Sequence, residues 1–253
     1  MKIAVAIKQV PLRDSLLRVN AAGTWIEEGN LGFEINEPDA YALEEALQLR
    51  EKHGGEVIVI SAGPARVSQT IREALAKGAD RGIHIDVATI DTLHIANLLA
   101  AALKTEAPDL ILTGLQSDDL GYGQTGVVLA ELLGLPSSTI IMQIELQPGK
   151  VHVKRELEDG WFQHIEMPLP AVLTIQSGLN KLRYATLMGI KKAKTKEIKV
   201  ITLDGAAEVP PASVVIEKIY APEKNKQGQI FDGDPKAAAA KLVEKLRFEA
   251  RVL

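Results

Sequence analysis

Short apolar runs alternate with helical patterns along the first 145 residues, and this alternation restricts the possible folds more than any other feature of the sequence. Apolar runs at 3–7, 57–61 and 110–113 have strand character, and each is followed after a loop by a helical pattern. The series is completed by strands at 83–86 and 138–144 and by helices at about 39–53, 68–77, 91–105 and 125–133. Because strands that alternate with helices form a parallel sheet with helices on both faces, we predict an α/β fold with a doubly wound, mostly parallel, Rossmann-like sheet.

Two segments depart from this alternation. Residues 18–35 are longer than a usual connection between a strand and a helix, and they contain Trp25, so we expect a small hairpin excursion there. Residues 151–155 and 161–167 flank Glu158-Asp159-Gly160, which is typical of a turn with positive φ, and they predict an antiparallel hairpin. The strand at 171–175 then returns to the sheet.

The last fifty residues have a different character. Prolines at 210, 211 and 222 and the polar stretch 224–229 predict an extended arm with little core of its own. A helix at about 234–251 follows, and its apolar stripe includes Leu242, Val243 and Leu246. We therefore divide the chain into an α/β domain at 1–200, which includes the 151–167 hairpin and a 180–196 loop, and a C-terminal arm and helix at 201–253.

Composition excludes several classes of function. The formal net charge is −4 and the pI is near 5.8, so no overall basic field favours nucleic acid as a partner. The chain has no cysteine, which excludes disulfides, thiolate metal sites and a cysteine nucleophile, and which fits a reducing cytoplasm. No apolar run is long enough for a signal peptide or a membrane span, so we expect a soluble, cytoplasmic protein.

No catalytic constellation is visible in the sequence. The five histidines are scattered without metal-ligand spacing, and neither a P-loop nor a G-x-S-x-G elbow occurs. We therefore expect no metal site and no enzyme activity of the chain itself.

A glycine-rich loop at 114–126 is the strongest candidate for a binding site. Its 121–126 segment matches G-x-G-x-x-G, but several residues separate the preceding strand from the first of these glycines, so the dinucleotide fingerprint does not apply. A flexible loop before a helix nevertheless presents free N–H groups to an anion such as phosphate. Asp118 and Asp119 suit a ribose or a cation better than phosphate. The alternative is that the glycines only make a tight connection and Thr125 only caps the helix at 125–133, just as Asn36 would only be an N-cap for the helix at 39–53.

The 180–196 loop is unusually apolar for a connection. It carries Tyr184, Leu187, Met188 and Ile190, and it ends in a lysine run. Such a loop either packs back on the core as a satellite cluster or binds a partner. The lysines are either a solvated face or a surface that steers an acidic partner.

The order of these motifs resembles that of electron transfer flavoprotein beta subunits. The resemblance is carried by Val153-Lys154-Arg155-Glu156, Leu169-Pro170-Ala171-Val172, the segment from Leu182 to Leu187 and the lysines at 191–194, and it extends over nearly the whole chain. It implies an adenine nucleotide α-hydrolase-like fold, a buried AMP in this nucleotide-binding domain, and an FAD held mainly by an alpha subunit around which the 201–253 arm wraps. The AMP site that it implies comprises Ala6, Asn36, Glu37, Pro38, Asp39, Ala62, Gly114, Gln116, Ser117, Asp118, Asp119, Gly121, Tyr122, Gly123, Gln124 and Thr125.

The same resemblance implies functions of contact. Leu187 matches a leucine that inserts into a hydrophobic pocket of a dehydrogenase, with Tyr184 and Met188 beside it. Glu156 matches a glutamate near the mobile flavin domain, although it is equally a surface charge. The expected donors are acyl-CoA or other flavoprotein dehydrogenases, as in fatty acid oxidation, and the acceptor is a quinone oxidoreductase or a similar protein.

Three alternatives stay open at this point. A second FAD in place of AMP would make the chain part of an electron-bifurcating protein. An ATP-using enzyme of the adenine nucleotide α-hydrolase type would share the fold, but the glycine-rich loop that such enzymes carry after the first strand is absent at 9–11. A nucleotide sensor of the universal-stress type would explain neither the arm nor the loop around Leu187.

Overall fold

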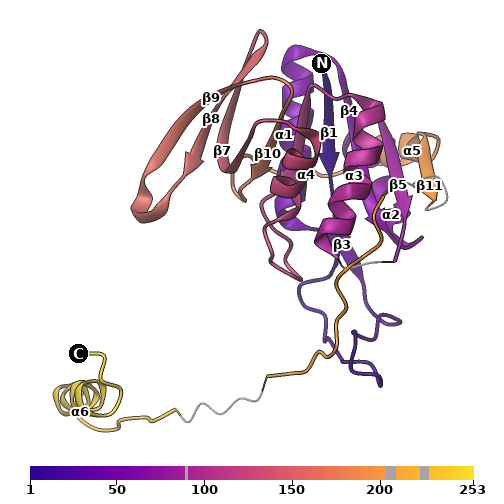
Figure 1. Cartoon of the computed structure of the whole chain (residues 1–253). Coiled ribbons are helices and arrows are strands. Elements are labelled where there is room, and N and C mark those ends of the chain that lie inside the picture. Colours follow the sequence, from indigo (N-terminus) through magenta and orange to yellow (C-terminus); the bar gives the residue numbers. More distant parts are fainter. Residues whose placement is uncertain (89–90, 203–208, 223–227) are drawn as a thin grey trace.

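The core of the protein is one twisted sheet. The computed structural model describes residues 1–88, 91–202, 209–222 and 228–253. Within these residues the main sheet has nine strands in the order β11-β5-β4-β1-β6-β10-β7-β8-β9 (Figure 1). Parallel pairing joins β11 (Ile198–Thr202), β5 (Arg81–Asp86), β4 (Glu56–Gly63), β1 (Lys2–Ala6), β6 (Leu110–Gly114), β10 (Ala171–Ile175) and β7 (Ser137–Gln147). The antiparallel strands β8 (Lys150–Glu156) and β9 (Phe162–Pro168) extend this sheet from β7.

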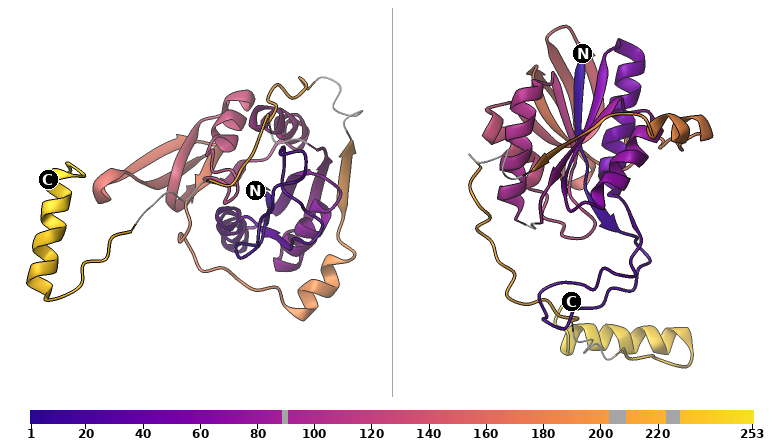
Figure 2. Two further views of the ribbon diagram at one scale, coloured as in Figure 1. Left: turned by 90° about the horizontal axis from the view of Figure 1, so that it is seen from below. Right: turned by 90° about the vertical axis from the view of Figure 1, so that its right-hand side faces the viewer.

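Helices cover both faces of the sheet, as predicted (Figure 2). Helices α1 (Glu37–His53) and α2 (Val67–Lys77) pack on one face, and α3 (Thr92–Glu106) and α4 (Thr125–Leu133) pack on the other. Alternate residues of β1 separate these two cores, since Ile3 and Val5 face α1 whereas Ala4 faces α3. Each fully buried aliphatic side chain contributes about 1.5–3 kcal/mol, so the two cores together hold the sheet in place.

The hairpin predicted at 151–167 is present, whereas the excursion predicted at 18–35 is part of a longer connection that begins at β2 (Gln9–Pro11). There β2 pairs antiparallel with β3 (Phe33–Ile35), and Val19 forms an isolated bridge to Ile26. The turn between β8 and β9 contains a 3₁₀ segment, η1 (Glu158–Gly160). Asp159 has φ 55° and Gly160 has φ 76° there, which are the left-handed conformations that the sequence predicts.

Two elements after β10 were not expected. Residues 187–193 form a short helix, α5 (Leu187–Ala193), inside the segment that the sequence suggests is a loop. The Thr186 hydroxyl accepts a hydrogen bond from the Gly189 N–H and so caps this helix. Strand β11 then adds an edge to the sheet beside β5, so the sheet continues past residue 200.

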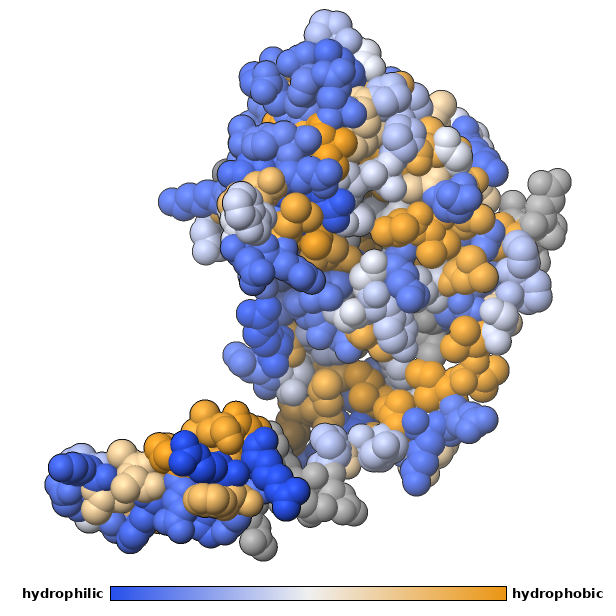
Figure 3. Space-filling view, turned by 60° about the vertical axis from the view of Figure 1, so that its left-hand side comes forward, coloured by the Kyte–Doolittle hydropathy of each residue, from blue (hydrophilic) through white to orange (hydrophobic). Residues whose placement is uncertain are grey.

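The arm leaves the sheet after β11. Residues 209–222 of the arm run along α3 toward the excursion, where the Ile219 N–H donates to the Gly23 carbonyl at 2.7 Å (Figure 1). Helix α6 (Pro235–Phe248) lies apart from the sheet, has no buried residue, and shows apolar side chains on its surface (Figure 3). Most of the polar stretch predicted at 224–229 lies outside the described residues. None of the described helices is both long and apolar enough to cross a membrane.

Candidate functional site

A cavity of about 450 Å³ lies beyond the carboxyl ends of β1, β4 and β6. The chain moves from β1 to β4 on one side and later returns to β6 on the other side, so the strand order reverses between β1 and β6. Open α/β sheets bind ligands at such a switch point. The cavity volume is within the range of small-molecule sites.

The beginning of α1 is tied to the loop after β6. Asn36 occupies the N-cap position of α1, but its side chain makes no cap bond among the described residues. Its amide instead donates to the Gln116 carbonyl at 2.9 Å and accepts from the Asp118 N–H at 2.9 Å. The interpretation of Asn36 as an ordinary side-chain cap is therefore wrong, because both polar atoms of the amide hold the glycine-rich loop in position.

Asp39 joins the ends of two central strands. Its carboxylate accepts hydrogen bonds from the Lys8 N–H at 2.7 Å and from the Gly114 N–H at 2.8 Å. Burial raises the pKa of Asp39 to about 7, while these two N–H groups oppose the increase. Gly114 leaves no room for a side chain here, because an added Cβ would meet Pro38 and Asp39.

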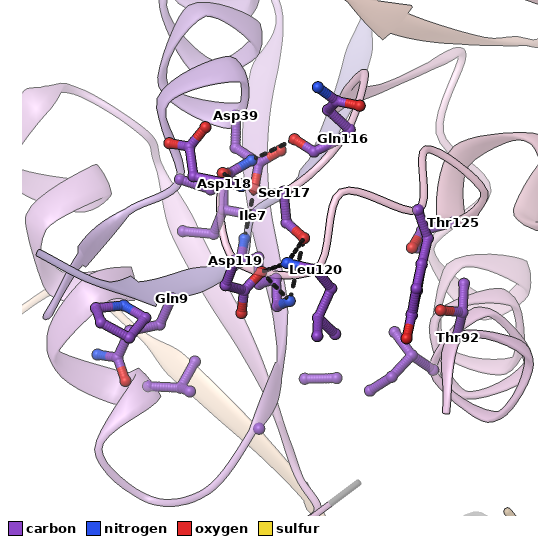
Figure 4. A pocket seen from close by; sticks show the side chains of 18 of the residues that line it. Ile7, Gln9, Asp39, Thr92, Gln116, Ser117, Asp118, Asp119, Leu120 and Thr125 are labelled. Atoms are coloured by element: carbon purple, nitrogen blue, oxygen red, sulfur yellow. Dashed lines mark hydrogen bonds and ion pairs between the residues drawn. The ribbon is translucent and has the colours of Figure 1, made fainter. Parts of the chain in front are cut away.

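The glycine-rich loop brings polar groups to the cavity before α4 begins (Figure 4). Lys8 Nζ lies 2.6 Å from an Asp119 carboxylate oxygen and 3.2 Å from the Ser117 hydroxyl. Desolvation opposes the effect of Lys8, and the net pKa of Asp119 is lowered. Helix α4 begins at Thr125 with Gln124 in the N-cap position, and no side-chain cap is present within the described residues. Thr125 is therefore not the cap, and the first N–H groups of α4 remain for a ligand.

The other half of the cavity is apolar and was missed by the sequence analysis. Its walls come from the excursion and from the arm, and they include Leu17, Trp25, Ile26, Phe33 and Ile219. The aromatic residues of 18–35 were a signal for this wall, whereas nothing in the sequence placed Ile219 there.

Two residues that line the cavity each carry a buried polar atom without a hydrogen-bond partner among the described residues. These atoms are Gln9 Oε1 and Arg66 Nε. The guanidinium of Arg66 also lies 4.4 Å from the centroid of the Phe33 ring.

Most of the predicted cofactor residues converge on this cavity. The exceptions are Glu37, Pro38, Gly114 and Gly121, which do not line it. The Glu37 carboxylate faces a neighbouring surface and pairs with Arg13 at 2.7 Å, and Pro38 is buried in the first turn of α1. The residues that do line it are Ala6, Asn36, Asp39, Ala62, Gln116, Ser117, Asp118, Asp119, Tyr122, Gly123, Gln124 and Thr125. Lys8 and Thr92 also line the cavity and were not predicted from the sequence.

The docking residues predicted in the 180–196 segment are exposed, and they lie near the β11 end of the sheet, away from the β8–β9 hairpin at its other end (Figure 1). Tyr184 is 93% exposed, Leu187 is 88% exposed and Met188 is 61% exposed. The alternative of a satellite cluster packed on the core is therefore wrong for these side chains. Glu156 is not part of this surface, because it lies at the end of β8 opposite Phe162, far from α5 (Figure 1).

Ionic contacts hold the segment before α5 against α1. Arg183 pairs with the buried Glu44, with Nε 2.7 Å from Oε2, and with the exposed Glu51, with Nη1 2.6 Å from Oε1. The Asn180 amide donates to Glu45 at 3.0 Å. The pKa of Glu51 is lowered, chiefly by its hydrogen bond with Arg183.

Helix α5 is fixed to α2 by two reciprocal contacts. Arg72 donates to the carbonyls of Ala193, the last residue of α5, and of Lys196, three residues later. Lys196 Nζ in turn donates to the carbonyls of Leu75 in α2 and of Ala79, two residues after α2 ends. Gly189 lies against the Ala76 carbonyl without room for a side chain. The exposed apolar residues of α5 are thus presented on a rigid support.

Metal-binding chemistry finds no support in the described ranges. No group of three or more His, Cys, Asp or Glu side chains in them is arranged to hold a metal ion.

Comparison with known proteins gives a consistent result. The electron transfer flavoprotein domain model matches residues 23–206. The chain is 37% identical to "Electron transfer flavoprotein subunit beta" of Methylophilus methylotrophus, over 96% of this chain and 97% of that protein. It is 38% identical to the subunit of the same name from Bradyrhizobium diazoefficiens and 37% identical to "Electron transfer flavoprotein subunit beta, mitochondrial" of Arabidopsis thaliana, with 100% of each chain covered in both comparisons.

Proposed function

This chain belongs to the family of electron transfer flavoprotein beta subunits, and from this premise we propose that it binds AMP, forms a heterodimer with an alpha subunit, and docks dehydrogenases through α5. The observation that carries the proposal is the convergence of the loops after β1, β4 and β6 on one cavity at the switch point. That position favours a nucleotide.

The residues of the cavity suit AMP. The uncapped beginning of α4 and the hydroxyl of Thr125 would hold the phosphate, with Lys8 as the nearby cation. The apolar walls would hold the adenine ring, and Asp118 or Asp119 would accept from the ribose hydroxyls. In this arrangement AMP supplies no chemistry and acts as a buried structural ligand that joins α1, α3 and α4.

The redox chemistry of the heterodimer would reside in the FAD of the alpha subunit. This chain would contribute part of the surface around that flavin, and α6 would wrap the alpha subunit with the apolar side chains that it leaves exposed. Electrons would reach the flavin from an acyl-CoA or another flavoprotein dehydrogenase and would leave to a quinone oxidoreductase or a similar acceptor.

Docking would depend on Leu187. A large exposed aliphatic side chain on a rigid helix is a good anchor for a hydrophobic pocket, and the neighbouring lysines at 191, 192 and 194 would steer an acidic partner. Glu156 would act elsewhere, near the moving flavin domain. The cytoplasmic location stays a prediction, since one relative has a mitochondrial name.

The nucleotide content of the purified heterodimer tests the proposal. The chain would be co-expressed with its alpha subunit, the complex denatured, and the released FAD and AMP quantified by chromatography. One AMP and one FAD per heterodimer is the expected result. Two FAD without AMP would instead make it an electron-bifurcating protein, and a stable flavin-free monomer that hydrolyses ATP would refute both.

The docking part is tested separately with Leu187→Ala. We expect the rate of flavin reduction by an acyl-CoA dehydrogenase to fall at low concentrations of the heterodimer and to recover at saturation, because the variant weakens encounter and leaves the flavin unchanged. Val200→Ala is the matched control, since Val200 is exposed on β11 outside α5. Equal activity of the two variants would contradict a docking role for Leu187.

A further inference from the structure

Asp91, the residue just before α3, binds the arm next to the proposed nucleotide site. We call residues 209–222 the strap. Asp91, immediately before α3, is buried and uses both carboxylate oxygens. Oδ1 accepts from the N–H groups of Leu93 and His94 and so caps α3. Oδ2 accepts from the Ser213 N–H at 2.7 Å, the Ser213 hydroxyl at 3.1 Å and the Val214 N–H at 3.1 Å.

Apolar packing holds the strap at Val209, which packs against the core, and at Ile219, but it contributes little next to Asp91. Val214 is 57% exposed, Val215 is 84% exposed and Tyr220 is 75% exposed. The other polar contacts of the strap that the structure describes are His94 Nδ1, which lies 2.7 Å from the Pro210 carbonyl oxygen, and the bond from Ile219 to Gly23. The cluster around Asp91 is therefore the main polar attachment of the strap within the described residues. The pKa of Asp91 is lowered to about 2, first by the Ser213 N–H, so the carboxylate is fully charged at neutral pH.

The strap then reaches the cavity. Ile219, five residues after Val214, is part of the cavity wall and faces the region lined by Trp25 and Ile26. Thr92 and Ile95, which follow Asp91 on α3, line the same cavity. The carboxylate of Asp91 thus caps the first turn of α3 and also binds the strap, which carries Ile219 to the apolar side of the site.

We infer that Asp91 is a positioning residue for the nucleotide site, because it fastens the strap that keeps Ile219 in the wall of the cavity. The inference rests on the proposed AMP site and adds a role for the arm besides contact with the alpha subunit. A nucleotide enclosed by the strap leaves only when the strap detaches, so Asp91 controls the rate of AMP dissociation.

Asp91→Asn tests this inference in the intact heterodimer. Asn is a good N-cap and keeps Oδ1 for α3, but it replaces Oδ2 by an amide that cannot accept from Ser213 and Val214. We expect the strap to become susceptible to limited proteolysis and AMP to dissociate about tenfold faster or more, as the loss of about 1.4 kcal/mol predicts. Asp234→Asn, which changes the corresponding cap of α6, is the matched control and should alter neither quantity.

Ile219→Ala distinguishes the contribution of the cavity wall from that of the attachment at Asp91. This variant should accelerate AMP dissociation while the strap stays protected from proteolysis. Rapid proteolysis of the Asp91→Asn strap with unchanged AMP dissociation would overturn the inference, and so would a strap that stays protected. If the wild-type heterodimer releases no AMP, the proposed function fails, and the proteolysis comparison still shows whether Asp91 fastens the strap.

Discussion

Removing the guanidinium of Arg183 tests whether the docking segment is held by the ion pair with α1. In Arg183→Met, Glu44 loses hydrogen bonds from Nε at 2.7 Å and Nη2 at 3.1 Å while its own side chain is only 5% exposed. Breaking a fully buried ion pair costs about 3–5 kcal/mol. Because the Arg183 side chain is 30% exposed and water reaches the pair, we reduce this to about 2–3 kcal/mol.

The assay is thermal unfolding followed by circular dichroism at neutral pH. For a chain of this size each kcal/mol lowers Tm by about 2–4 °C, so Arg183→Met should lower it by about 4–12 °C. Glu51→Gln removes the charge from the other partner, whose side chain is 51% exposed, and should cost at most about 1 kcal/mol.

A double variant identifies the cause. In Arg183→Met with Glu44→Gln no buried charge is left unpaired, and the Gln48 amide, which donates to Glu44 Oε1 at 2.8 Å, retains an acceptor. We expect this double variant to recover more than half of the loss in Tm. A single Arg183→Met variant as stable as Glu51→Gln would refute the reasoning, because Glu44 would then not depend on Arg183.

Three further predictions concern other parts of the molecule. Leu242→Asp should leave the Tm of the isolated chain unchanged, because Leu242 is 46% exposed on α6, but it should reduce the yield of heterodimer in size-exclusion chromatography; an unaffected yield would contradict contact through α6. Asp39 has a folded pKa of about 7, above its ordinary value of 3.8, so its contribution to stability is present below pH 4 and is lost as pH rises to 7. Asp39→Asn should therefore flatten the decrease in the urea midpoint between pH 5 and pH 8, which corresponds to at most about 3 kcal/mol, and an unchanged slope would assign that decrease to other groups. Gly189→Ala places a Cβ against the Ala76 carbonyl and should cost about 1–3 kcal/mol in urea unfolding, with a weaker response to the dehydrogenase; wild-type stability would show that α5 is not packed tightly on α2.

The sheet and its helices could be predicted from the sequence because local signals and the global fold agree there. The helix predicted at 125–133 is α4 with the same bounds, and its Gly134 ends it in the left-handed conformation with φ 65°. The turn at Asp159 was also predictable, since only a few residue types adopt positive φ readily. In both places the residues that decide the structure are adjacent in sequence.

The elements that were missed depend on distant contacts. Helix α5 has seven residues, contains Gly189, and has its end capped by Arg72 from α2. An isolated helix of this length is unstable, so no local pattern could predict it. Strand β11 follows directly from a lysine-rich segment and gains its hydrogen bonds at the edge beside β5. These elements form only because α2 and β5 are already in place.

The part of the candidate site that is built from the loops after the strands could be predicted from the sequence. The loops after β1, β4 and β6 meet at the switch point for any sheet of this order, so the polar half of the cavity could be located from the sequence. The apolar half could not, because the path of the excursion and of the strap is set by single bonds such as that from Ile219 to Gly23. The amide of Asn36 shows the same limit, since its partners lie some 80 residues away.

Helix α1 connects the two functions that we propose. It begins at the cavity with Asn36 and Asp39, and it carries Glu44 in its second turn and Glu51 in its last turn, which hold Arg183 in front of α5. A ligand that binds only the folded chain stabilises it by about 2.7 kcal/mol at a hundred times its Kd. Switch-like coupling between the two sites would require two alternative arrangements of α1, and the structure shows one. AMP at one end of α1 would therefore stabilise the helix that holds the proposed docking segment in place.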